Sequence, residues 1–292
     1  MTRMRKPIVA LIYDFDGTLS PGNMQEYAFI QAIGTNKEEF WAENNQLAGA
    51  QDADPVLTYM FMMMRKAINK GVSLKRESFQ KFGASVPLFK GVEHWFDRID
   101  AYAESRGIII EHYINSSGLK EMIEGTIIAG KFKQIYACSY MYSVDGVAQW
   151  PAVAVNFTTK TQFLFRINKG VESNKEINKV NEFVKESDRR VPFSRMIYFG
   201  DGETDIPCMK LVKQQGGHSI AIYHSKSNVK DITQRLIKDE RVNFVCNADY
   251  SEGKEIDRVV KTILDKIKAD CEFNNLMQHH KEKIINSIPN EE

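Results

Sequence analysis

The sequence predicts an α/β fold in which a doubly wound, mostly parallel sheet carries an inserted all-helical segment. Short apolar runs alternate with helical patterns from residue 91 to residue 269, as in sheets whose parallel strands are connected by helices. Residues 22–87 instead show helical patterns without a convincing strand. We therefore expect an α/β core domain from residues 1–20 and 88–292 and a helical domain from residues 21–87.

The first strand is predicted at residues 8–13, where IVALIY is apolar throughout, as expected of a strand buried on both faces. Glycine and proline then separate four helical patterns, at residues 24–33, 37–48, 54–70 and 74–82. Trp41, Tyr59 and Phe61 fall in these patterns. Packing between helices is the preferred interpretation for them, and a substrate pocket is the alternative.

The core elements follow in the order that a wound sheet requires. A helix is predicted at residues 91–106 and a strand at residues 108–115. Further strands are predicted at residues 134–142, 147–155, 196–199, 219–223 and 242–246, and further helices at residues 160–168, 174–186, 206–214 and 255–269. Residues 270–292 are polar, and we expect a loose helix or a tail there.

Composition and charge argue against several classes of protein. The chain has 39 Lys+Arg and 38 Asp+Glu, so its net charge of +1 gives no electrostatic footprint for nucleic acid or an anionic membrane. No apolar run approaches a membrane span, and the run after the basic N-terminus is too short for a signal peptide. The four cysteines have no C-x-x-C spacing, which indicates a reducing compartment. We expect a cytoplasmic protein without nucleic-acid or membrane partners, and the oligomeric state stays open.

Carboxylates directly follow two of the predicted strands. Asp14 and Asp16 end the first strand in YDFDGTL, and Asp201 and Asp205 follow the strand at residues 196–199 in GDGETD. The first pair alone is also typical of a turn, but ligands of open α/β sheets bind at the carboxyl ends of strands, so the four side chains should converge. Carboxylates packed together need a cation or shared protons. Oxygen ligands without histidine or cysteine favour Mg²⁺ over Zn²⁺.

These motifs resemble those of the haloacid dehalogenase (HAD) superfamily, whose members are mostly phosphatases. DFDGT is similar to its first motif, D-x-D-G-T, and GDGETD to its fourth, G-D-G-x-T-D. The sequence NSSG at residues 115–118, after an apolar strand, resembles the second motif. A helical insert between the first and second motifs is similar to the cap of the phosphoserine-phosphatase-like branch. The resemblance implies a HAD-like Rossmannoid core with a helical cap. It also implies Mg²⁺-dependent hydrolysis of a small soluble phosphomonoester through an aspartyl-phosphate.

The resemblance implies catalytic roles for the carboxylates. Asp14 would be the nucleophile, and Asp16 would protonate the leaving oxygen and then activate water as a base. Mg²⁺ would be bound by Asp14, by Asp201 and by the backbone carbonyl of Asp16, and Asp205 would complete or orient the metal shell.

Five further residues are expected around the phosphate. Gly17 would let the backbone approach the phosphate and offer its N–H as a donor, and Thr18 would support this loop. The hydroxyl of Ser116 would hold a phosphoryl oxygen, helped by the N–H of Ser117 or Gly118 at the start of a helix. Ser117 is the alternative to Ser116, because the two are adjacent.

The third motif of the family is a single lysine, which should begin a helix and neutralise charge on the phosphate. Lys160, Lys169 and Lys175 are the candidates. We favour Lys160, which opens the strongly helical pattern TKTQFLFRI. Lys169 precedes Gly170 and so resembles a helix end, and Lys175 opens another predicted helix.

Other functions are possible on the same scaffold. A dehalogenase needs neither Asp16 as an acid nor Mg²⁺, and an ion pump needs membrane spans, so the sequence argues against both. A phosphotransferase or phosphomutase uses the same four motifs and is not excluded. A non-catalytic ligand-binding protein is the alternative from another class, although Asp14 and Asp16 are both present.

The sequence does not indicate which substrate the protein acts on. Arg65 and Arg76 are candidates for binding an anionic group, with solvated helix faces as the preferred interpretation.

Overall fold

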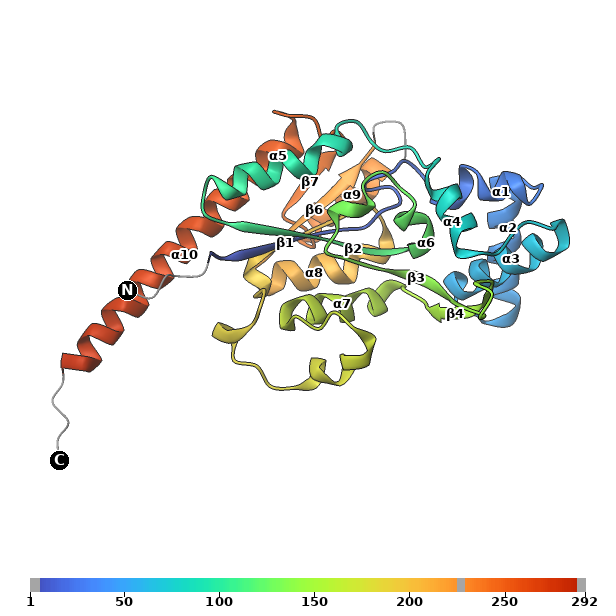
Figure 1. Ribbon diagram of the computed structural model, residues 1–292. Coiled ribbons are helices and arrows are strands. Elements are labelled where there is room, and N and C mark those ends of the chain that lie inside the picture. Colours follow the sequence, from blue (N-terminus) through green and yellow to red (C-terminus); the bar gives the residue numbers. More distant parts are fainter. Residues whose placement is uncertain (1–5, 225–228, 288–292) are drawn as a thin grey trace.

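The computed structural model describes residues 6–224 and 229–287, and its centre is a twisted sheet (Figure 1). In this described part of the chain the sheet has seven strands in the order β4-β3-β2-β1-β5-β6-β7. Their bounds are Ile8–Tyr13 (β1), Ile109–Leu119 (β2), Gln134–Tyr142 (β3), Ala148–Val153 (β4), Met196–Gly200 (β5), His218–Tyr223 (β6) and Phe244–Asn247 (β7). All neighbouring pairs are parallel except β3 and β4. The predicted α/β class with a mostly parallel sheet is confirmed.

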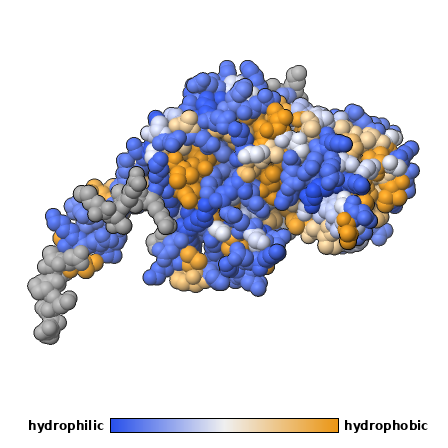
Figure 2. All heavy atoms as spheres, viewed as in Figure 1, coloured by the Kyte–Doolittle hydropathy of each residue, from blue (hydrophilic) through white to orange (hydrophobic). Residues whose placement is uncertain are grey.

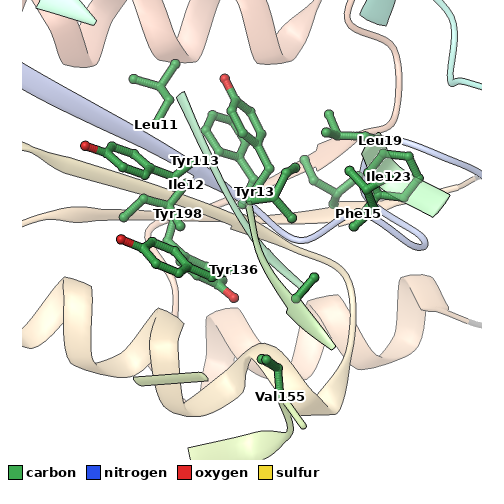
Figure 3. Close-up of a cluster of buried hydrophobic side chains, with 14 of the residues drawn as sticks. Leu11, Ile12, Tyr13, Phe15, Leu19, Tyr113, Ile123, Tyr136, Val155 and Tyr198 are labelled. Carbon is green, nitrogen blue, oxygen red and sulfur yellow. The ribbon is translucent and has the colours of Figure 1, made fainter. Parts of the chain in front are cut away.

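The central strand β1 is buried because β2 and β5 pair with it on its two edges. Ile8 lies opposite Ile109 on one side, and Ala10 lies opposite Met196 on the other. Aromatic and aliphatic side chains fill the space on both faces of these strands (Figure 3). Phe15 continues this buried cluster past the end of β1 and packs the loop that follows against the core. The start of the carboxylate motif is therefore held rigidly by its neighbours.

Helices cover both faces of the sheet. Figure 1 shows α5 (Val92–Glu104) and α10 (Glu255–Ser287) on one side of the sheet, and α7 (Phe157–Lys169) and α8 (Ile206–Gln214) on the other. The short helix α6 (Lys120–Glu124) follows β2, and α9 (Val229–Lys238) connects β6 to β7. The outer surface is largely hydrophilic, with smaller apolar patches (Figure 2). No described helix combines the length and the apolar character that crossing a membrane requires.

The helices between β1 and α5 lie together at the right-hand end of Figure 1. They comprise a 3-10 turn at Met24–Glu26, α1 (Phe29–Ala32), α2 (Lys37–Gln51), α3 (Pro55–Lys70) and α4 (Arg76–Gly83). Side-chain caps explain two of the starts: Asn36 accepts from the N–H of Glu39, and Asp54 accepts from the N–H of Val56. These helices pack against α6 and β4. The domain boundaries at residues 20 and 88 stay a prediction.

Two segments differ from the elements that the sequence predicts. The helix predicted at residues 174–186 consists of 3-10 turns at Asn174–Asn181 and Glu186–Asp188. Its apolar residues Ile177 and Phe183 are exposed, so the pattern has no core surface to pack against, and most helical stability comes from such packing. Conversely, α10 continues through most of the polar segment after residue 269, where a loose helix or tail was expected.

Candidate active site

The predicted site residues lie at the carboxyl edge of the sheet. Asp14 directly follows β1, Asp201 directly follows β5, and Asp205 is the N-cap residue of α8. Lys160 lies in the first turn of α7, which packs beside α8. Because parallel strands end at one edge of the sheet, these four side chains meet although they come from distant segments.

Lys160 is fully buried between two carboxylates. Its Nζ lies 3.0 Å from Oδ2 of Asp14 and donates to Oδ1 of Asp205 at 2.7 Å. Burial alone would lower the pKa of Lys160, but the two carboxylates outweigh it and raise this pKa above its ordinary value. The side chain is therefore a permanent cation. The other candidates lie elsewhere: Lys169 donates to the carbonyl of Val180 at 2.6 Å, and Lys175 is exposed.

Asp14 and Asp16 differ in their surroundings. Asp14 contacts Lys160, and its Oδ1 accepts from the N–H of Phe15 at 2.7 Å. Burial and the nearby Asp205 raise the pKa of Asp14 to about 6, although Lys160 opposes this shift. Asp16 accepts from the N–H of Met24 at 2.9 Å. Burial and the charge of Asp14 raise the pKa of Asp16 well above its usual range, so Asp16 keeps a proton more readily than an ordinary aspartate.

The loop after Asp16 approaches the second carboxylate motif closely. Gly17 has φ +73°, and a Cβ there would lie 2.0 Å from Oδ2 of Asp201, so glycine is required. The N–H of Gly17 donates to the carbonyl of Ser20 at 2.7 Å, and the donor that we expected for phosphate therefore already has an acceptor. Thr18 is buried, and its carbonyl accepts from the hydroxyl of Tyr250 at 2.9 Å. This contact holds the loop through its backbone, and the supporting role expected of the Thr18 side chain stays a prediction.

The serine motif lies in β2 rather than at the start of a helix, because β2 continues to Leu119. The Oγ of Ser116 accepts from the N–H of Gly118 at 3.1 Å, and a hydrogen bond from Ser116 helps to ionise Asp14. The Oγ of Ser117 is buried, with no hydrogen-bond partner among the described residues. Gly118 faces Asp16, since a Cβ there would lie 3.1 Å from its Oδ2. Ser116 and Ser117 both line the cavity described below.

Three carboxylates form a group that fits a hard cation. Asp14, Asp201 and Asp205 each offer an oxygen, and these atoms all lie within 4.8 Å of one another. Burial and the charge of Asp14 raise the pKa of Asp201 well above its usual range. Oδ1 of Asp205 already accepts from Lys160 and from the hydroxyl of Tyr198, both at 2.7 Å. Its Oδ2 accepts from the N–H of Gly202 at 3.4 Å. The oxygen-only donor set is of the type that Mg²⁺ prefers.

A cavity of about 590 Å³ opens from these carboxylates toward the helices between β1 and α5. Trp41 and Tyr59 line it, so the pocket interpretation that we ranked second applies to both, whereas Phe61 is not among the lining residues. Sequence reasoning missed the lining residues Gln25 and Asn44. Asn44 had a signal, because it is a polar residue at a buried helical position, four residues from both Phe40 and Ala48.

The sheet, the carboxylates at its edge and the buried lysine agree with the family resemblance of the sequence motifs. Residues 11–210 match the model of the haloacid dehalogenase-like hydrolase family. This match spans more than half of the chain and contains every site residue discussed above. The chain therefore belongs to the haloacid dehalogenase-like hydrolase family.

Individual relatives agree with this assignment. The chain is 28% identical, over 281 residues, to an uncharacterized protein of Borreliella burgdorferi, covering 86% of this chain and 95% of that protein. Its fold is similar to a HAD family hydrolase from Salmonella enterica serovar Typhi, with a TM-score of 0.52, 15% identity and coverage of 83% and 68% of the two chains. It is also similar to a substrate-bound phosphoserine phosphatase, with a TM-score of 0.51, 15% identity and coverage of 88% and 99%. The predicted phosphoserine-phosphatase-like branch is confirmed at the level of the fold.

Proposed function

We propose that this protein is a Mg²⁺-dependent phosphomonoester hydrolase that acts on a small phosphorylated molecule. The observation that carries the proposal is the group of Asp14, Asp201 and Asp205 beside the buried Lys160 at the carboxyl edge of the sheet. Lys160 and the N–H of Phe15 favour the ionised form of Asp14, as a nucleophile requires. Asp16 has a strongly raised pKa, as a general acid requires. Two carboxylates with pKa values set apart by their surroundings support such an assignment of roles.

The proposed reaction has two steps. Asp14 attacks phosphorus, the bond between phosphorus and the leaving oxygen breaks, and Asp16 gives its proton to that oxygen. The deprotonated Asp16 then removes a proton from a water molecule, which attacks phosphorus and releases phosphate from the aspartyl group. Lys160 balances negative charge throughout, and the hydroxyl of Ser116 or Ser117 binds a phosphoryl oxygen.

Asp14, Asp201 and the backbone carbonyl of Asp16 would hold Mg²⁺, with Asp205 completing the shell. The bound ion would offset the repulsion between a carboxylate nucleophile and a phosphate dianion. We further propose that residues 21–87 act as a cap that encloses the leaving group, since α2 and α3 contribute to the cavity wall. A cytoplasmic location is proposed as well, and the four free cysteines support it.

Phosphate release from a panel of phosphomonoesters tests the proposal. We expect release with Mg²⁺, none with EDTA, and a loss of at least about a thousandfold in kcat for Asp14→Asn, because the amide cannot form the acyl phosphate. Asp145→Asn is the matched control, since Asp145 is an exposed aspartate in the turn between β3 and β4. Release that persists in Asp14→Asn would contradict the role of Asp14.

Transfer of phosphate to a second alcohol is the alternative reaction on this site. It is distinguished by supplying a non-phosphorylated alcohol and following transfer by phosphorus NMR. If no ester is hydrolysed and none transfers its phosphate, although the protein is folded and binds Mg²⁺, a binding role replaces the enzymatic one.

A further inference from the structure

The wall of the cavity that faces away from the carboxylates combines amide and aromatic side chains with the apolar Pro55 and Val56, and it carries no charged side chain. The helices contribute Gln25, Trp41, Asn44, Asn45 and Tyr59 to it. Among the described lining residues there is no lysine or arginine, while Glu203 adds negative charge nearer the reaction centre. Lys160 is engaged by Asp14 and Asp205. A leaving group in this cavity therefore meets amides, aromatic rings and carboxylates.

Two amide oxygens on this wall lack hydrogen-bond donors. Oδ1 of Asn44 and Oε1 of Gln25 are buried without a partner among the described residues, and each residue is only 2% exposed. The orientation of Asn44 is determined, because its Nδ2 donates to the carbonyl of Pro55 at 3.3 Å. Buried polar atoms in proteins are normally paired, and exceptions often mark a place where another molecule binds. Both oxygens can only accept hydrogen bonds.

Arg65 and Arg76, the two candidates for binding an anionic group, contact other residues outside the cavity. The guanidinium of Arg76 lies 4.3 Å from the ring centroid of Tyr142, and its Nη1 is 3.5 Å from Glu124. The guanidinium of Arg65 lies over the ring of Phe61, 5.8 Å from its centroid. Neither residue lines the cavity. A carboxylate or a second phosphate on the leaving group would thus be desolvated without a lysine or arginine among the described lining residues to balance its charge.

We propose that the leaving group is an alcohol without negative charge that donates hydrogen bonds, either a polyol or an amino alcohol, and that Asn44 and Gln25 select it. A hydroxyl or an ammonium group supplies the donors that both oxygens lack. This inference rests on the proposed hydrolase function and deepens it. It separates this site from one that recognises a phosphorylated amino acid through its carboxylate.

Matched pairs of substrates test whether the site prefers a leaving group without negative charge. O-phosphoserine has one carboxylate more than O-phosphoethanolamine, and 3-phosphoglycerate has a carboxylate where glycerol 1-phosphate has a hydroxymethyl group. We expect kcat/KM to be at least about tenfold higher for the member without the carboxylate in each pair. Comparison of the two favoured esters then separates the amino-alcohol class from the polyol class. A preference for either carboxylated ester would overturn the inference.

Variants test the role of the amide. Asn44→Leu removes the acceptor and keeps the branching of the side chain, so KM should rise about tenfold or more for the favoured ester. The rise in KM should be smaller for p-nitrophenyl phosphate, whose leaving group donates no hydrogen bond. Gln46→Leu is the control, because Gln46 is exposed on the same helix and does not line the cavity. An equal loss for both substrates in Asn44→Leu, or no loss for either, would contradict a role in selectivity.

A binding measurement separates this inference from the proposed function. The four esters are titrated into the Asp14→Asn variant with Mg²⁺ present and followed by calorimetry. We expect tighter binding of the esters without the carboxylate, whether or not the wild type turns them over. Absence of hydrolysis by the wild type with the expected binding order would remove only the hydrolase proposal. Equal binding, tighter binding of the carboxylated esters, or no binding of any ester would overturn the inference.

Discussion

Lys160 shows how much a single residue contributes to this site. It is wholly buried, and its ammonium group is shared between Asp14 and Asp205. A buried charge that loses its partner is far more costly than an exposed one. The lysine therefore stabilises the fold as well as the charge that the proposed reaction develops.

Replacement of Lys160 by methionine should lower the free energy of unfolding by about 3–5 kcal/mol at pH 7 in EDTA, because two buried carboxylates lose their counter-charge. Urea denaturation followed by circular dichroism measures the change. Lys169→Met is the control on the same helix. It loses hydrogen bonds to the carbonyls of Val180 and Glu182 at the surface, so it should cost about 1 kcal/mol. Equal effects of the two changes would contradict a buried ion-pair network.

Glu111 on β2 gives a pH-dependent prediction away from the site. It accepts hydrogen bonds from Arg190, from Lys133 at 2.8 Å and from the hydroxyl of Tyr113 at 2.6 Å. Burial alone would raise the pKa of Glu111, but these partners outweigh it and lower the pKa to about 2 from an ordinary value of 4.5. A carboxyl with a depressed folded-state pKa contributes stability above its unfolded pKa and loses it as the pH falls.

Glu111→Gln should therefore destabilise the protein by about 1–2 kcal/mol at pH 7, a value discounted because Lys133 and Arg190 are partly exposed. The difference from wild type should shrink as the pH falls from 4.5 toward 2. Unfolding curves at pH 7, 4.5 and 3 measure this trend. Glu252→Gln, at an exposed glutamate, should show little difference at any of these values. A deficit that grows on acidification would contradict the assignment.

At the scale of elements, α4 and α6 approach each other through glycines. A Cβ on Gly83 of α4 would lie 1.8 Å from the carbonyl oxygen of Met122, and one on Gly125 would lie 1.9 Å from the carbonyl oxygen of Gln80. The backbones of the two helical segments are therefore in direct contact at both glycines. The contact anchors the last helix of the proposed cap to the segment that follows the serine motif.

Gly83→Ala should destabilise the protein by about 1–3 kcal/mol, because the helices must separate to admit the methyl group. Gly49→Ala is the matched change within α2. Its added Cβ would meet nothing within 4 Å, so it should stabilise by about 0.4–1 kcal/mol. Thermal unfolding of the two variants beside wild type measures both effects. A stabilising Gly83→Ala change would show that the crossing is looser than described.

Some elements could be predicted from local sequence and others could not. IVALIY and MIYF are apolar throughout, so strands ending at Asp14 and near Asp201 follow from pattern alone. The segment at residues 174–186 has an equally helical pattern, but no neighbouring surface covers Ile177 and Phe183. Whether a pattern becomes a helix depends on what lies beside it, and that information is not local.

For the whole molecule, the convergence of the carboxylates was predictable because the topology of parallel sheets requires it. The cavity was not. Asn44 and Gln25 face it because of how α2 and the preceding turn pack against the core, and the sequence does not specify that packing. Gly17 also needed the structure, since its N–H proved to be used within its own loop.

Metal binding should stabilise the whole fold. Mg²⁺ at about a hundred times its Kd should add about 2.7 kcal/mol, because the ion binds the folded carboxylate cluster and not the unfolded chain. Differential scanning fluorimetry across a Mg²⁺ titration measures this shift, and EDTA should reverse it. Asp201→Asn should weaken the response, while Asp145→Asn should leave it intact. A response unchanged in Asp201→Asn would place the ion elsewhere.

The position of β1 in the sheet has a consequence for how the chain is made. β1 leaves the ribosome well before one of its two partners, β5, which spans Met196–Gly200. Until β5 is synthesised, one edge of the most apolar strand has no neighbour, and such edges invite pairing with other chains. The emerging chain must therefore shield this edge by delay or by a chaperone. Slowing synthesis between β2 and β5 should increase aggregation, whereas slowing it after β5 should not.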